Sequence, residues 1–373
     1  SVMCGQSTST DGDITGNHGY YDGWVIKLDA NGVKQWQKCY GGGLSDGIFA
    51  IKQTSDNGFI MAGYTGSVDG DVTGNHGGTD GWVIKTDNNG NVQWKKCIGG
   101  SKTDVFNGVN TCNDNGFILV GRTTSTDGDL AANKGLLDGW LVKLDAAGNI
   151  EWSKNYGGSD DEYIMSAVQI DDNNFVFCGF SKSNNNDLSG NYGDSDAWFG
   201  KANATDGSLL WSYQYGGSGY DAVYNLCKAT DSSGRIIAAG ITNSPNDYNI
   251  TGNHGDYDAL VLSIDETSGI LTEAKCFGGK KSDNFFSIQN TYDKGYILSG
   301  STVSQNGDVS YNADITNGQL WVVKLNNSRT IDWERTYGGP EYESGYGAFE
   351  INNGGFFIAG DTYGNGGDVS GYH

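Results

Sequence analysis

The chain has 373 residues and a formal net charge of −22. So acidic a chain has no basic surface to displace counterions from phosphate, which excludes nucleic acid as a partner and favours cations. No apolar run reaches the roughly 18 residues that span a bilayer, and the first residues lack a signal pattern. We therefore expect a chain that does not span the membrane, in a mature or trimmed form that leaves room for a longer parent protein or an assembly.

Composition favours many short strands over disorder, because sixty glycines, ten tryptophans and twenty-one tyrosines accompany only two prolines. A unit of about sixty residues recurs along the chain. Complete copies cover 43–100, 101–158, 159–217, 218–279 and 280–339, and partial copies cover 1–42 and 340–373. Self-similarity at a fixed period indicates one repeat domain spanning 1–373.

Each complete copy holds four short apolar or alternating runs, which in the copy 43–100 are 48–53, 59–64, 82–86 and 92–96. The turns Asp56-Asn57-Gly58 and Asn88-Asn89-Gly90 favour hairpins between the first and the second pair of runs. Antiparallel four-stranded units at this period are typical of propeller blades. We predict an all-β fold, a single β-propeller of four-stranded antiparallel blades, with the ring closed by N- and C-terminal strands that share a blade.

Six blades is the leading count, and seven is the alternative. Residues 2–5 and 357–360 both resemble a second strand, so one is surplus or the natural chain is longer. Tryptophans recur on the third and fourth strands, and we predict that they pack blade against blade. Cys39, Cys97 and Cys276 share one repeat position, so they should lie in different blades, too far apart to bridge, as small buried thiols.

The long connection between the second and third strands carries oxygen-bearing side chains at a fixed spacing. In the copy 43–100, Asp69, Asp71, Thr73, Asn75 and Asp80 occupy positions 1, 3, 5, 7 and 12, with glycine at 6. This is the spacing of an EF-hand loop, which predicts calcium as the cofactor. The matching residues elsewhere are Asp11, Asp13, Thr15, Asn17, Asp22, Asp127, Asp129, Asp138, Asp187, Asn191, Asp196, Asp247, Asn249, Asn253 and Asp258. The alternative is that these side chains only stiffen turns, without a metal.

A second set of acids begins each first strand: Asp46, Asp104, Glu162, Asp221, Asp283 and Glu343. If the first strand lines the axis of the propeller, these six carboxylates ring the channel mouth. They would then hold a cation or contact a basic group of a ligand. The alternative is that each accepts backbone N–H bonds from the adjoining turn.

Catalysis finds little support in the sequence. His18, His76, His254 and His373 share one position in separate loops, which suggests neither a histidine zinc site nor a Ser-His-Asp arrangement. A single active site normally breaks a repeat. The clearest breaks are 160–163, 245–248 and 312–319.

The motifs GG-x3-D, DNGFI-x-AG and DGWVIKLD-x-NG, with a tryptophan before the next GG, cover nearly the whole chain. This pattern resembles the secreted propeller-repeat proteins common in Bacteroidetes, and more distantly kelch and pyrroloquinoline-quinone-type propellers. The fifth copy departs from it, with Leu260 and Leu271 in place of tryptophans. The resemblance implies an extracellular or cell-surface setting and says little about activity.

Together these features predict a calcium-stabilised extracellular binding or adhesion module. Its expected partner is a glycan or a cell-surface or secreted protein, bound through the face that carries the long loops. The alternative function is a carbohydrate-active enzyme, either a glycoside hydrolase or a polysaccharide lyase, with its site at the channel mouth. Fold alone does not decide between them.

Overall fold

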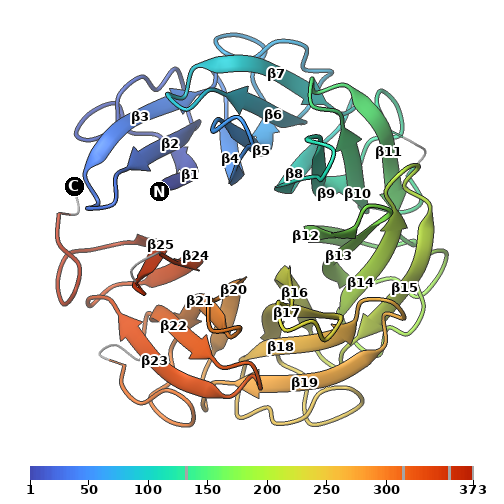
Figure 1. Ribbon diagram of the computed structural model, residues 1–373, viewed down its shortest axis with the longest axis vertical. Helices are drawn as coiled ribbons and strands as arrows, with labels where there is room; N and C mark the ends of the chain where they lie inside the picture. The colour runs from blue at the N-terminus through green and yellow to red at the C-terminus, as the bar shows by residue number, and fades with distance from the viewer. Residues whose placement is uncertain (131–132, 313–315, 352–353, 372–373) are drawn as a thin grey trace. The chain divides into compact units, whose positions relative to one another are not determined.

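The computed structural model describes residues 1–130, 133–312, 316–351 and 354–371. All regular structure within these ranges is β-strand, and the strands pair antiparallel in chain order (Figure 1). The predicted fold class, an all-β propeller with four-stranded antiparallel blades, is confirmed. Among the described residues no helix is long and apolar enough to cross a membrane.

Five sheets have four strands each. The first is β4 (Asp46–Gln53), β5 (Phe59–Thr65), β6 (Asp80–Thr86) and β7 (Val92–Ile98), and the second is β8 (Asp104–Thr111), β9 (Phe117–Thr123), β10 (Asp138–Leu144) and β11 (Ile150–Tyr156). The third is β12 (Glu162–Asp171), β13 (Asn174–Ser181), β14 (Asp196–Asn203) and β15 (Leu209–Tyr215). The last two are β16 (Asp221–Lys228), β17 (Arg235–Thr242), β18 (Asp258–Asp265) and β19 (Leu271–Phe277), then β20 (Asp283–Asn290), β21 (Tyr296–Thr302), β22 (Gln319–Leu325) and β23 (Ile331–Tyr337).

The terminal strands form smaller sheets. β1 (Val2–Ser7), β2 (Asp22–Leu28) and β3 (Lys34–Tyr40) make a three-stranded sheet, and β24 (Glu343–Glu350) pairs with β25 (Phe356–Thr362). By sequence, β24 and β25 are the first and second strands of a blade, and β1 to β3 are the second to fourth. Six blades of four account for all but one of the twenty-five strands in the described ranges. The extra strand is the duplicated second strand that the repeat predicts.

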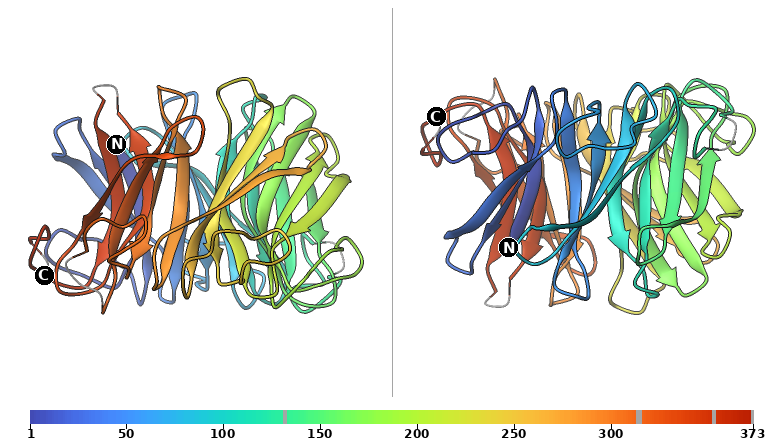
Figure 2. Two further views of the ribbon diagram at one scale, coloured as in Figure 1. Left: turned by 90° about the horizontal axis from the view of Figure 1, so that it is seen from below. Right: turned by 90° about the horizontal axis from the view of Figure 1, so that it is seen from above.

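The chain divides into two compact units. The first comprises residues 1–175 and 203–208, and the second comprises residues 176–202 and 209–373. In the first unit the first strands β4 and β8 lie side by side, and in the second unit β16, β20 and β24 do (Figure 1). Within each sheet, antiparallel order puts the two hairpin turns at one end of the strands. The long loops and the links to the next sheet lie at the other end (Figure 2).

Tryptophans pack the sheets together, as predicted. Those of the third strands are buried in four blades: Trp82, Trp140, Trp198 and Trp321. Those of the fourth strands reach the next blade, where the ring of Trp36 lies 6.1 Å from that of Phe59 and Trp94 lies 6.0 Å from Phe117. All seven cysteines lie in the described ranges and are free thiols.

Five first strands, β4, β8, β16, β20 and β24, hold a β-bulge in a constant place. In β8 the pairing with β9 shifts between Phe106 and Gly108, and in β4 the pairing with β5 shifts between Ile48 and Ala50. A bulge turns the extra residue's side chain away from the regular alternation. Each of these five strands therefore presents one additional side chain, and the identity of that residue varies between blades.

Candidate functional site

The six acids that begin the first strands are buried within the blades. Five are 0% exposed, and Glu343 is 3% exposed. Asp104 accepts the N–H of Gly100 at 2.8 Å, the Ser125 hydroxyl at 2.8 Å and the Thr123 hydroxyl. The second glycine of the preceding pair also donates to the other five acids: Asp46, Glu162, Asp221, Asp283 and Glu343.

This burial disfavours the prediction that the six carboxylates at the channel mouth hold a cation or contact a basic group of a ligand. A carboxylate without exposed surface has no open side for a ligand. The alternative, in which each acid accepts N–H bonds from the adjoining turn, is what the hydrogen bonds show. The recurrence of the acid is explained by the Gly-Gly turn that it holds.

The acids predicted to close the calcium loops are also buried. Asp22, Asp80, Asp138, Asp196 and Asp258 are 0% exposed, at the start of the third strands. The Oδ2 atom of each accepts the backbone N–H of the residue four positions earlier. In three copies a histidine Nδ1 also bonds to this oxygen, as His76 does to Asp80 at 2.6 Å. His373 lies outside the described residues.

Acids of neighbouring blades come close across the Gly-Gly turn. A Cβ built on Gly99 would lie 2.9 Å from Oδ1 of Asp80 and 2.8 Å from Oδ2 of Asp104. Oδ1 of Asp80 is buried and has no hydrogen-bond partner among the described residues. In the sixth copy Gln319 takes the place of this aspartate, and its amide donates to the carbonyl of Gly339 at 3.0 Å. A neutral side chain therefore suffices at this position of the repeat.

Burial is the main cause that raises the pKa of Asp196 to about 7 from 3.8, and the charges of Asp221 and Asp247 add to it. The N–H of Tyr192 acts in the opposite direction. Because the unfolded carboxyl ionises near its ordinary value, the folded chain binds more protons than the unfolded chain between about pH 4 and pH 7. Stability should therefore fall as the pH rises through this window.

Between about pH 4.5 and pH 8, we expect the free energy of unfolding of the wild type to fall by roughly 2 kcal/mol relative to that of Asp196→Asn. Urea unfolding at each pH, in EDTA, measures the difference. Asp256→Asn removes an exposed carboxylate and serves as the matched control, with no such pH dependence. Parallel pH curves for wild type and Asp196→Asn would contradict the expectation.

The remaining predicted ligands make turns or lie exposed. Asp69, Asp127 and Asp247 accept N–H groups of the Gly-Gly turns, and Asp71 and Asp129 accept weaker ones at 3.4 and 3.2 Å. Asn17, Asn75, Asn191 and Asn253 brace the loops by bonding to backbone on both sides, and Asn249 accepts from Gly216. The Thr15 hydroxyl accepts a hydrogen bond from the Gln37 side-chain amide, and Asp13 forms an ion pair with Lys34. Asp187 is half-buried, and Asp11 and Thr73 are exposed.

These bonds engage one oxygen of each loop-closing acid, Oδ2, and leave the other, Oδ1, without a hydrogen-bond partner among the described residues. In the part of the chain that the structure describes, no three Asp, Glu, His or Cys side chains gather in a way that could hold a metal ion. The N–H bonds alone do not exclude a metal, because ligating carboxylates also accept hydrogen bonds, but the described residues lack the gathered acids of an EF-hand loop. We therefore expect the same melting temperature in EDTA and in millimolar calcium. An upward shift with calcium would show binding to the folded state.

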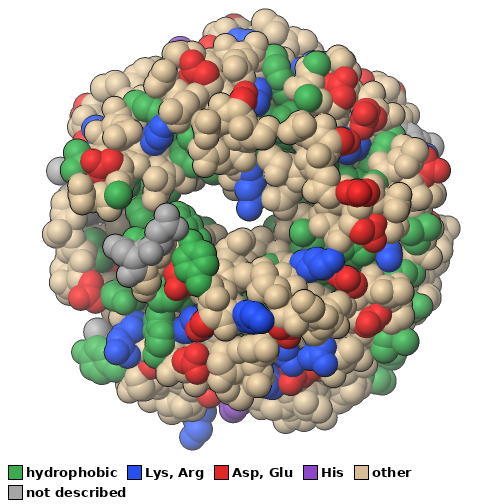
Figure 3. Space-filling model, in the orientation of Figure 1, with side chains coloured by type: hydrophobic (Ala, Val, Ile, Leu, Met, Phe, Trp, Pro, Cys, Tyr) green, Lys and Arg blue, Asp and Glu red, His purple; other side chains and the backbone are tan. Residues whose placement is uncertain are grey.

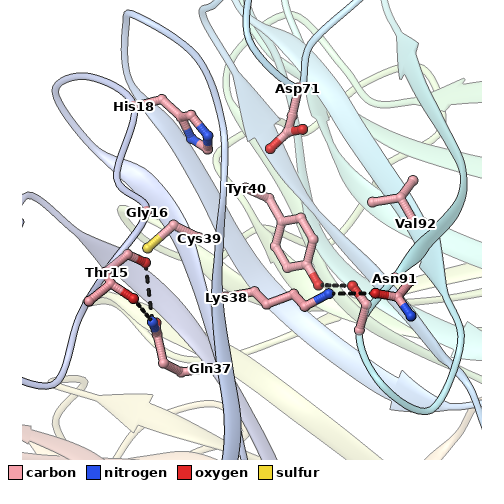
Figure 4. A pocket seen from close by; sticks show the side chains of 11 residues that line it. Thr15, Gly16, His18, Gln37, Lys38, Cys39, Tyr40, Asp71, Asn91 and Val92 are labelled. Atoms are coloured by element: carbon pink, nitrogen blue, oxygen red, sulfur yellow. Dashed lines mark hydrogen bonds between the residues drawn. The ribbon is translucent and has the colours of Figure 1, made fainter.

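A groove of about 410 Å³ lies in the first unit between the sheet β1–β3 and the sheet β4–β7, lined by their loops and outer strands (Figure 4). Lys38 Nζ donates to Asn91 at 2.8 Å, and the Tyr40 hydroxyl donates to Gly90 at 2.7 Å. His18 and Asp71 face the groove from opposite sides (Figure 4). Most of its polar groups satisfy one another, so this groove joins blades and offers few free donors to a ligand.

Two exposed tyrosines stack on each other in the second unit. Tyr192 lies in the loop before β14 and Tyr248 in the loop before β18, and their rings are 4.6 Å apart and nearly parallel. They are 43% and 65% exposed. Tyr248 has φ +44°, whereas Gly70 and Gly128 hold the equivalent left-handed position in other blades. The sequence marks 245–248 as a break in the repeat, but no sequence signal shows that Tyr192 would meet it.

Comparison with known proteins adds nothing about activity. The chain matches no protein-family model and no curated protein. Among solved structures, the Neurospora crassa Pan2 WD40 domain is 12% identical, with a TM-score of 0.43 over 76% of this chain and 70% of that one. A Synechocystis apocarotenoid oxygenase mutant is 12% identical, with a TM-score of 0.48 over 89% of this chain and 75% of that one. Sqt1 from Chaetomium thermophilum is 11% identical, with a TM-score of 0.47 over 96% of this chain and 90% of that one.

Proposed function

We propose that this chain is an extracellular binding module that takes a neutral glycan on the stacked pair Tyr192 and Tyr248. The observation that carries the proposal is Tyr248, a bulky residue held in a left-handed conformation and left mostly exposed. Such a backbone costs about 1–2 kcal/mol for a residue other than glycine. Strain of this kind is concentrated at binding sites, where it positions a side chain.

The groups around the pair suit sugar hydroxyls. Oδ1 of Asn184 accepts the N–H of Gly190 at 2.9 Å, and Oδ1 of Asn246 accepts the N–H of Gly252 at 2.5 Å. Both asparagines are exposed, and their Nδ2 groups have no hydrogen-bond partner among the described residues. An open aromatic face beside oriented amide donors is the combination that holds an apolar ring face and its polar edge together.

Charge favours a neutral sugar over an acidic one. The two loops carry Asp187, Asp194, Asp247 and Asp256 against a single lysine, Lys182. A carboxylate or sulfate on the ligand would meet like charge here. The surface seen in Figure 3 is mostly neutral polar groups and backbone, with acidic and basic side chains scattered among them.

The test is a screen of neutral polysaccharides and oligosaccharides by glycan array and calorimetry, repeated with Tyr248→Gly. This substitution restores the residue that other blades use at this position, so it removes the ring and relieves the strain. We expect binding to fall at least about tenfold while the melting temperature stays within a few degrees. Tyr311→Gly, at a tyrosine that is 69% exposed in another loop, is the matched control. Undiminished binding by Tyr248→Gly would overturn the proposal, as would release of cleaved product.

A further inference from the structure

Arg122 of β9 is a half-buried cation with no carboxylate partner. The basic side chains that are buried outright among the described residues all pair with an acid: Lys85 with Asp56, Lys143 with Asp114, Lys324 with Asp293 and Arg329 with Glu273. Arg122 instead makes a single hydrogen bond, from Nη1 to Oδ1 of Asn107 at 3.0 Å. With 45 acidic residues in the chain, this lack of an acidic neighbour calls for an explanation.

Two neighbours fix the position of the guanidinium. Asn107 is the bulged residue of β8, and its Nδ2 donates to the carbonyl of Ile164 in β12 at 2.9 Å, so its Oδ1 is turned toward Arg122. On the other side, the guanidinium carbon lies 5.2 Å from the ring centre of Tyr163. Both contacts come from the first unit. A guanidinium held by an amide and an aromatic face is oriented before any ligand arrives.

The energetics of this arrangement point to an anion. A guanidinium has five N–H donors in a planar fork, and Arg122 uses one of them. Burial lowers the pKa of Arg122, but an arginine keeps its charge at neutral pH. A partly desolvated charge without a counterion is unfavourable, and an oxyanion on the free donors would remove that cost through charge-assisted hydrogen bonds.

We propose that Arg122, positioned by Asn107 and Tyr163, binds the carboxylate of an acidic saccharide or another small organic acid. The planar fork of the guanidinium matches the two oxygens of a carboxylate. This site belongs to the first unit, whereas the tyrosine pair belongs to the second, so the two sites can be tested separately.

The experiment is a calorimetric titration with glucuronate, with methyl glucoside as the neutral analogue and sulfate as the second oxyanion. We expect wild type to bind glucuronate and not methyl glucoside, with an affinity that falls as salt rises. Arg122→Ala should weaken glucuronate binding at least about tenfold. Lys102→Ala removes one exposed positive charge from the same sheet's preceding turn and should change the affinity less than about twofold.

Arg122→Lys keeps the charge and loses the fork, so it should bind at least about threefold more weakly than wild type. It also serves as a substitute if the alanine variant does not fold, and melting curves identify which variants are folded. If folded Arg122→Ala binds glucuronate as tightly as Lys102→Ala does, the proposal is overturned. If the alanine variant unfolds, folded Arg122→Lys takes its place in this comparison. No detectable glucuronate binding by wild type, or binding of sulfate without glucuronate, would also overturn the proposal.

Discussion

Replacing Asp104 by alanine should lower the free energy of unfolding by roughly 3 kcal/mol or more. The carboxylate is fully buried and accepts from Gly100, Ser125 and Thr123. The substitution leaves these three donors without an acceptor, and each buried unsatisfied group costs about 1–3 kcal/mol. Equilibrium unfolding in urea measures the loss. This effect should exceed that at Asp69 or Asp127, because these two loop acids are exposed.

Asp256→Ala is the control for Asp104→Ala, since Asp256 is an exposed acid and its loss should change stability by less than about 0.5 kcal/mol. Asp104→Asn keeps the shape and one acceptor oxygen, so it should fall between the two. A loss below about 1 kcal/mol for Asp104→Ala would mean that water replaces the carboxylate. The Gly-Gly turn would then not depend on the acid.

Gly121→Ala should destabilise the chain by about 3 kcal/mol, the second large effect. Gly121 of β9 lies opposite Phe106 at the bulge of β8, and a Cβ there would overlap the carbonyl oxygen of Val105. The obstacle is backbone in the middle of a sheet, so it cannot rotate away as a side chain would. The bulge and both strands would have to shift together, and thermal unfolding would report the cost.

The chain offers a matched control for this glycine. Gly5 occupies the same place in β1, which is a second strand whose sheet has no first strand beside it. A Cβ on Gly5 would meet nothing within 4 Å. We expect Gly5→Ala to be nearly neutral, within about 0.5 kcal/mol. Equal losses at Gly5 and Gly121 would show that the bulge is not the cause.

The positions of the functional candidates were only partly predictable. The loop spacing of Asp69, Asp71 and Asp80 matches an EF-hand, but the same residues accept backbone N–H groups, because aspartate serves equally as a metal ligand and as a turn former. Sequence spacing cannot distinguish the two uses. Whether several oxygens gather around one point does, and that is a property of the folded loop.

The sequence by itself determined the strands, their order and the four-stranded blade. Hydrophobic alternation and turns such as Asp56-Asn57-Gly58 are local signals, and each copy of the repeat carries them again. The structure alone decided burial and contact between residues far apart in sequence. It placed Asp80 of one blade near Asp104 of the next, stacked Tyr192 on Tyr248, and set Arg122 against the ring of Tyr163 in the next blade. Such pairs arise where neighbouring blades pack, and no pattern within a single repeat encodes which side chains will meet there.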